Sequence, residues 1–267
     1  MGKIIAIANQ KGGVGKTTTT INLAASFAAM KRKVMLIDLD PQGNASVGSG
    51  IYKDQITHQA HHVLCHEVAI KDALVKSDSG YDVLPTTQEL IVAEMELLHA
   101  PEREYRLKKI LATIVNDYDF ILIDCPPSLS ILTVNALVAA NSVLVPVQCE
   151  YFALEGLSGL LSTIEQIRTT INPKLYIEGL LRTMYDGRNR LALDVSAQLL
   201  EHFPERVYRT VIPRNVRLAE APSHGTAILN YDGKSQGALA YLALAGEILR
   251  RDEQAAKQSK KEAMELA

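Results

Sequence analysis

Several features that would define a class of protein are missing from this 267-residue sequence. No stretch reaches the roughly 18 consecutive apolar residues of a membrane span, and the apolar N-terminus is too short for a signal peptide. The net charge of -2 argues against a chain that coats nucleic acid. The three cysteines have neither metal-ligand nor redox spacing, and they are Cys65, Cys125 and Cys149. We therefore expect a cytoplasmic protein in which any DNA binding comes from a local patch.

A linker rich in proline, glycine and serine is also missing, so nothing divides the chain into separate domains. With 47% hydrophobic residues, the chain can bury a sizeable core. We expect one domain over residues 1–250. The charged, alanine-rich residues 251–267 are expected to form a C-terminal helix or tail, in which Met264 and Leu266 are the large apolar groups.

Seven short apolar runs alternate with helical patterns along the chain. Their hydrophobicity is continuous, which is typical of strands buried on both faces of a parallel sheet. We predict an α/β fold, a three-layer α/β/α sandwich with a mostly parallel, doubly wound sheet and ligands at the carboxyl ends of its strands. The predicted strands are 3–8, 33–38, 81–85, 120–125, 142–148, 176–181 and 207–213. The predicted helices are 16–31, 88–115, 130–140, 153–171, 191–203 and 235–251.

The segment NQKGGVGKTTTT, residues 9–20, lacks one glycine of the usual phosphate-binding pattern. In G-x-x-x-x-G-K-[ST] the first glycine would stand at position 10, but the sequence has Gln10 there and Lys11 next to it. The remaining glycines still let backbone N–H groups turn toward an anion at a helix N-terminus. We predict a di- or triphosphate nest in which Lys16 contacts phosphate and Thr17 binds Mg²⁺. Its residues are Lys11, Gly12, Gly13, Val14, Gly15, Lys16, Thr17 and Thr18.

Three aspartates lie at or just beyond the carboxyl ends of two predicted strands, at the same edge of the sheet. Asp124 ends the apolar run FILID, the Walker B arrangement, and Asp38 and Asp40 lie two residues apart in IDLDPQGN. Because side chains alternate along an extended segment, we expect Asp38 and Asp40 to point the same way. We predict Thr17, Asp38 and Asp124 as the metal residues and Asp40 as the group that orients or deprotonates the attacking water.

The combination of KGGVGKTT, DLDPQGN, LIDCPPSLS, VPVQCEYFALEGL and VIPRNVRLAEAPSHG resembles the ParA/Soj family of chromosome and plasmid partition ATPases. The resemblance covers residues 2–250 and places the chain in the deviant Walker A class of P-loop NTPases. It implies ATP/ADP and Mg²⁺ as cofactors and a weak intrinsic ATPase activity. It also implies an ATP-dependent homodimer, in which Lys11 reaches the phosphates of the partner subunit. Lys16 serves the nucleotide of its own subunit, and the catalytic residues are then Lys11, Lys16 and Asp40. The adenine loop of the family corresponds to Pro213, Arg214 and Asn215.

Residues 182–217 contain seven arginines and four acidic residues, so a positive patch stands in an acidic chain. Arg188 and Arg217 resemble the family's nonspecific contacts to double-stranded DNA, which act through phosphates and weaken with salt. The family resemblance also implies a ParB-type centromere-binding partner that stimulates hydrolysis, and an ATP form associated with the nucleoid.

Two alternatives and one further motif stay open at this point. A membrane-associated cell-division ATPase of the MinD type shares the phosphate loop, but its amphipathic C-terminal helix has no counterpart in residues 251–267. An electron donor of the nitrogenase iron-protein type would need paired cysteines. The segment HQAHHVLCHE invites a zinc interpretation, although we expect it to be a partly exposed helix face. Its candidate ligands are His58, His61, His62, Cys65 and His66.

Overall fold

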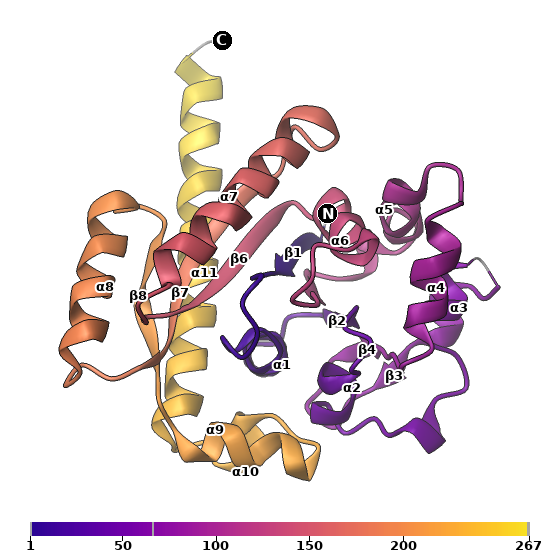
Figure 1. The fold of residues 1–267 in the computed structure, drawn as a ribbon, viewed down its shortest axis with the longest axis horizontal. Helices are drawn as coiled ribbons and strands as arrows, with labels where there is room; N and C mark the ends of the chain where they lie inside the picture. The colour runs from indigo at the N-terminus through magenta and orange to yellow at the C-terminus, as the bar shows by residue number, and fades with distance from the viewer. Residues whose placement is uncertain (1, 66, 266–267) are drawn as a thin grey trace.

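A mixed β-sheet with helices on both faces forms the centre of the molecule (Figure 1). The computed structural model describes residues 2–65 and 67–265, so His66 and Leu266 lie outside the described residues. Within the described chain the sheet has eight strands in the order β3-β4-β2-β5-β1-β6-β7-β8. Neighbouring strands are parallel except for β3 and β4. The predicted three-layer α/β fold is confirmed.

All seven predicted strands are present, and β7 continues four residues beyond the predicted end at residue 181. The two-residue strand β3, at the edge of the sheet, was not predicted. The bounds are β1 Lys3–Ile7, β2 Val34–Asp38, β3 Val75–Lys76, β4 Asp82–Leu84, β5 Phe120–Asp124, β6 Ser142–Gln148, β7 Tyr176–Tyr185 and β8 Val207–Pro213.

One predicted helix, residues 88–115, is wrong as a single element. The chain leaves the helix after Leu97 and re-enters one at Arg106, because Pro101 cannot continue a helix and Glu102 adopts a left-handed φ of 51°. The helices are α1 Lys16–Ala29, α2 Asn44–Gly48, α3 Ala60–Leu64, α4 Leu90–Leu97, α5 Arg106–Leu111, α6 Ile131–Ala139, α7 Ala153–Thr170, α8 Arg190–His202, α9 Val216–Glu220, α10 Ile228–Tyr231 and α11 Gln236–Glu265.

The long C-terminal helix α11 crosses the expected boundary at residue 250. Lys3 Nζ on β1 pairs with Asp252 Oδ1 (2.5 Å), and Arg251 donates to Val207 O on β8 (3.0 Å). The first residues beyond 250 are therefore attached to the sheet. None of the helices in the described part of the chain has the length and apolar character needed to cross a bilayer.

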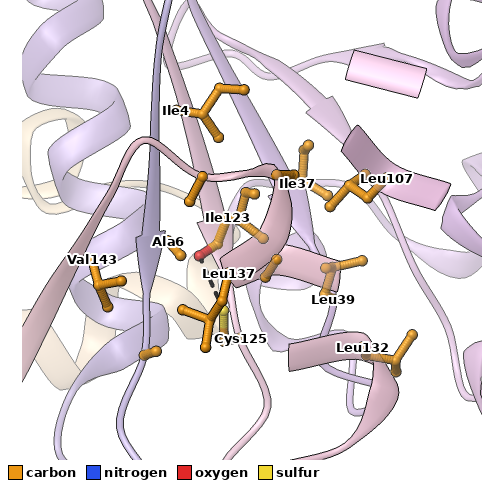
Figure 2. Packing of buried hydrophobic residues seen from close by; sticks show 14 of the residues in the cluster. Ile4, Ala6, Ile37, Leu39, Leu107, Ile123, Cys125, Leu132, Leu137 and Val143 are labelled. Carbon is orange, nitrogen blue, oxygen red and sulfur yellow. Dashed lines mark hydrogen bonds between the residues drawn. The ribbon is translucent and has the colours of Figure 1, made fainter. Parts of the chain in front are cut away.

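The continuous apolar runs are explained by cores on both faces of the sheet. Ile4 and Ala6 of β1 belong to one buried cluster, and Ile5 and Ile7 belong to the other. Figure 2 shows the first cluster, where strand residues meet helical ones such as Leu132 of α6. Successive apolar residues of the central strands thus bury their surface on one face or the other, at about 25 cal/mol per Å².

The strand order determines where polar groups converge. β1 lies between β5 and β6, and β2 lies on the far side of β5. Ile7 pairs in register with Asp124, and Asp124 pairs with Asp38. The carboxyl ends of β1, β5 and β2 are therefore side by side, which is where doubly wound folds bind ligands.

Candidate active site

The loop between β1 and α1 is shaped by two glycines in the left-handed region. Gly13 has a φ of 72° and Gly15 a φ of 89°, values that residues with a Cβ rarely adopt. Gly15 directly precedes Lys16, the first residue of α1. The loop therefore leads into a helix N-terminus, where free N–H groups and the helix dipole favour an anion.

Two side chains that the sequence analysis did not single out fasten this loop. Asn9 Nδ2 donates to Pro146 O on β6 (2.7 Å), and Asn9 Oδ1 accepts from the backbone N–H of Lys11 (2.9 Å). Thr183 Oγ1 on β7 donates to Val14 O (2.8 Å). These partners lie 137 and 169 residues from the loop, so no local motif could indicate them.

The two lysines of the loop make different contacts. Lys16 is buried, and its Nζ donates to the backbone O of Lys11 (3.4 Å). Burial lowers the pKa of Lys16, and the Asp124 carboxylate opposes this shift. Lys11 Nζ instead pairs with Glu150 Oε2 at the surface (2.7 Å). The structure thus holds Lys16 inside the loop and leaves Lys11 on the outside.

Asp124 and Asp38 lie beside one another and are fully buried. Thr17 Oγ1 and Thr20 Oγ1 donate to the two oxygens of Asp124 (2.7 and 3.0 Å). Both the N–H and the Oγ of Ser46 donate to Asp38 Oδ2 (2.7 Å each). Burial raises the pKa of both carboxyls. The charge of Asp124 adds to the shift at Asp38, whereas the threonine hydrogen bonds oppose it at Asp124.

Asp40 does not share the environment of Asp38. β2 ends at Asp38, and the chain turns at Asp40, whose Oδ1 accepts from the N–H of Gln42 (3.0 Å). Asp40 lines a cavity, but Asp38 is absent from the described lining. The two aspartates therefore separate into an inner position and an outer one, because the extended segment that would align their side chains stops between them.

A cavity of about 590 Å³ joins the phosphate loop to the end of β8. Its size lies in the usual range for small-molecule sites. Gly12, Gly13 and Gly15 line one side with Lys16, Thr17 and Thr18, and Pro213, Arg214 and Asn215 also line it. Two segments about 200 residues apart, predicted to bind phosphates and adenine, thus border one space.

The cavity also has walls that sequence reasoning missed. Met184 lies at the end of β7 with a left-handed φ of 47°, a backbone strain that costs about 1–3 kcal/mol and often marks functional sites. Tyr241, on α11, reaches the same space. Neither has a motif of its own. Further lining residues are Asn44, Pro127, Thr183, Ile212, Val216, Leu218 and Ala219.

The predicted DNA contacts lie outside this cavity. Arg188 is exposed and makes two hydrogen bonds to Asp186 (2.9 Å each). Arg217 is exposed at the start of α9 and pairs with Glu220 (2.8 Å). Arg182, counted in the positive patch, is buried and donates to Ser196 Oγ (2.8 Å). The usable patch is therefore smaller than the arginine count suggests.

Comparison with known proteins connects these features to a family. The AAA domain family matches residues 2–177. The sporulation initiation inhibitor protein Soj of Bacillus subtilis is 51% identical over 250 residues, 93% of this chain and 98% of that protein. The chromosome partitioning protein ParA of Caulobacter vibrioides is 51% identical over 253 residues, 94% of this chain and 95% of that protein.

This chain belongs to the ParA/Soj family of chromosome partitioning ATPases. The predicted family and class of enzyme, an ATPase, are confirmed. The same fold is found in cobyrinic acid a,c-diamide synthase from Mycobacterium smegmatis, whose structure contains bound ADP and magnesium. That structure is 38% identical with a TM-score of 0.84, over 96% of this chain and 97% of that one. The cell division ATPase MinD of Pyrococcus furiosus is 28% identical with a TM-score of 0.78, over 94% of this chain and 99% of that one.

Proposed function

We propose that this ParA/Soj protein is a nucleotide-dependent DNA-partitioning switch that binds ATP and Mg²⁺ in the cavity between the phosphate loop and the end of β8. The observation that carries the proposal is the shared cavity, with Lys16 and Thr17 at one end and Pro213–Asn215 at the other. The M. smegmatis relative, whose structure holds ADP and magnesium, supports this choice of ligand. Lys16 would contact the β- and γ-phosphates, and Thr18 the α-phosphate.

The donors around Asp124 fit a magnesium ion. Thr17, Asp124 and Asp38 offer the hydroxyl and carboxylate oxygens that this ion prefers. Two adjacent buried carboxyls are costly as anions without a cation, and their raised pKa values express that cost. When bound, Mg²⁺ would neutralise charge on the phosphate oxygens. Asp38 would hold a water bound to the ion and not the ion itself, because Ser46 already donates twice to one of its carboxylate oxygens.

Asp40 is the proposed base for hydrolysis. It lies in the cavity wall beyond the end of β2, and its Oδ1 accepts from the backbone N–H of Gln42 two residues on. That position lets the carboxylate orient a water toward the terminal phosphate and accept its proton. Lys16 would stabilise the charge that develops on the transferred group.

A second copy of the chain would complete this site by supplying its Lys11. The Lys11–Glu150 pair is exposed, and such pairs stabilise by only about 0–1 kcal/mol, so Lys11 can exchange Glu150 for a partner's phosphates. Tyr151 and Phe152, next in sequence, are 76% and 64% exposed. Exposed aromatic side chains of this kind are enriched at interfaces. The face around Lys11 is therefore the proposed dimer surface.

The ATP dimer would bind double-stranded DNA without sequence preference through Arg188 and Arg217. Both side chains pair with acids on the same segment, in ion pairs that exposed phosphates can replace. Two copies of a weak patch bind far more strongly than one, which couples DNA affinity to dimerisation. A ParB-type protein would then reset the switch by stimulating hydrolysis, and the ATP form would associate with the nucleoid.

The test measures DNA retention with ATP, with ADP and without nucleotide over a salt series, while light scattering follows the oligomeric state. We expect a dimer and salt-sensitive DNA binding with ATP alone. Binding that ignores the nucleotide would contradict the switch. ATP-dependent binding to anionic lipid vesicles instead of DNA would favour a MinD-type role.

A further inference from the structure

The histidine-rich segment at α3 was expected to be a partly exposed helix face, and the structure gives it a more specific arrangement. Cys65 directly follows the last residue of α3, and its backbone N–H donates to His61 O (3.0 Å), so these two residues lie one helical turn apart on the same side. Glu96 comes from α4, which packs against α3 at one edge of the molecule (Figure 1). The three side chains thus converge from two helices.

His61 is the unusual member of this group. Both of its ring nitrogens are inaccessible to solvent, and neither has a hydrogen-bond partner among the described residues. Nearly all buried polar atoms in folded proteins have a partner, and a buried unpaired group costs about 1–3 kcal/mol. One nitrogen of His61, the Cys65 sulfur and one Glu96 carboxylate oxygen lie within 4.8 Å of one another. A ligand that accepts electron pairs from all three would remove that cost at one of the two His61 nitrogens.

We propose that His61, Cys65 and Glu96 bind a divalent transition metal, with zinc as the best match, and that the metal joins α3 to α4. Imidazole, thiolate and carboxylate are the three protein ligands of zinc, and ligand atoms in a tetrahedral site lie about 3.3–3.8 Å apart. Small side-chain movements bring the observed spacing into that range. The exposed Glu96 leaves the fourth position to water.

A second group, His61 with His62 and Glu89, is the weaker candidate. Glu89 Oε2 already accepts from Gln59 Nε2 (2.5 Å), and His62 Nδ1 accepts from the backbone N–H of Gln59 (3.2 Å). These contacts hold the start of α3 to the segment before α4. His62 and Glu89 of the second group therefore already have hydrogen-bond partners, whereas the ring nitrogens of His61 have none among the described residues.

Metal binding at this site must displace one proton. Burial and the Glu96 carboxylate raise the pKa of Cys65 to about 12, with Glu67 adding to the shift and Arg106 opposing it. The thiol is therefore protonated without a metal. On binding, the sulfur gives its electron pair to the metal and its proton leaves to solvent. The charge of Arg106 helps to balance the thiolate.

The experiment uses the full chain, stripped with a chelator and then titrated with zinc by calorimetry and with cobalt by absorption spectroscopy. We expect one zinc per chain and, with cobalt, a sulfur-to-metal charge-transfer band. Cys65→Ser should abolish that band and weaken zinc binding by more than about 100-fold, the upper end of what loss of an outer-shell partner costs. The matched control Cys149→Ser removes a buried thiol elsewhere and should change neither readout.

Glu96→Gln guards against a folding artefact, because this exposed side chain is not part of the core. Glu94→Gln, on the same helix, is its control. Glu96→Gln should lower zinc affinity while the thermal melting of the metal-free protein stays at the wild-type value. No stoichiometric zinc uptake would overturn the proposal. So would zinc binding that survives Cys65→Ser and Glu96→Gln but is lost in Glu89→Gln, because the metal would then belong to the second group.

Discussion

The buried positive charge of the phosphate loop and the exposed arginines of the DNA patch are built in opposite ways. Lys16 is the first residue of α1, where the glycine φ angles of the preceding loop and the sheet register place it beside Asp124. Arg188 and Arg217 lie in solvent, each paired with a nearby acid. One buried lysine at a fixed position can bind a nucleotide phosphate specifically. A single exposed arginine binds DNA weakly, so strong binding needs several of them together. The predictions below test that difference.

Lys16→Ala should have the widest effect, because it removes the buried charge on which nucleotide binding, and so every later step, depends. Loss of one member of a buried charged contact costs about 2–5 kcal/mol, so nucleotide affinity should fall by about 30-fold to several thousand-fold. Equilibrium binding of a fluorescent ATP analogue measures this. Lys33→Ala, an exposed lysine, should bind as the wild type does. Normal affinity in Lys16→Ala would refute the phosphate assignment.

Lys11→Ala should separate nucleotide binding from assembly. The variant should still bind ATP as a monomer, but partner-stimulated hydrolysis should fall by about 10³–10⁵, as it does when a cation supplied in trans is lost. Turnover assays and light scattering with ATP make the measurement. Glu150→Ala removes only the surface partner of Lys11 and should still dimerise. A Lys11→Ala variant that dimerises and hydrolyses normally would show that the site is complete in one copy.

Asp40→Ala should trap the ATP dimer. Removal of a general base lowers the rate by about 10²–10⁴, while the phosphate loop and the arginines are unchanged. The expected result is slow hydrolysis together with persistent DNA binding, measured on the same sample. Asp54→Ala, an exposed aspartate, is the control. Wild-type turnover in Asp40→Ala would assign the base elsewhere.

Arg217→Glu should have the smallest effect, because it changes one contact of an exposed patch. DNA affinity at moderate salt should fall by about tenfold, roughly 1.4 kcal/mol, while ATP-dependent dimerisation stays. Arg168→Glu offers a close control, since Arg168 is also exposed and also pairs with an acid three residues away. Equal losses in both variants would mean that net charge, and not this patch, binds DNA.

Sequence patterns predicted most of the fold, because the central strands are buried on both faces and strands of this kind have continuous apolar runs that can be recognised in the sequence. The edge strand β3 was missed because two residues carry no periodic signal. The single helix predicted over residues 88–115 does not form, because the apolar spacing continues through Pro101 but the helix does not. Short helices such as α3 and α9 depend on tertiary contacts and leave no long pattern.

In the candidate site, too, features that are local in sequence could be predicted and features that depend on the tertiary structure could not. The phosphate loop and Asp124 could be predicted because their chemistry is local in sequence. The separation of Asp38 from Asp40 could not, since it depends on where β2 ends and on Ser46. Met184 and Tyr241 reach the cavity from distant elements, and only the assembled sheet brings them there.

The central place of β1 also sets an order of events during synthesis. Its partners are β5 and β6, which start 117 and 139 residues after Lys3. Until the ribosome has released β5, β1 has no neighbouring strand, and it gains its second neighbour only with β6. Pairing between such distant segments is slow because the loop must close first. The phosphate loop that follows β1 is thus synthesised early, but both strands beside β1 are available only after more than half of the chain has been made. A nascent chain that ends before β6 would carry the whole motif without a site to hold the nucleotide.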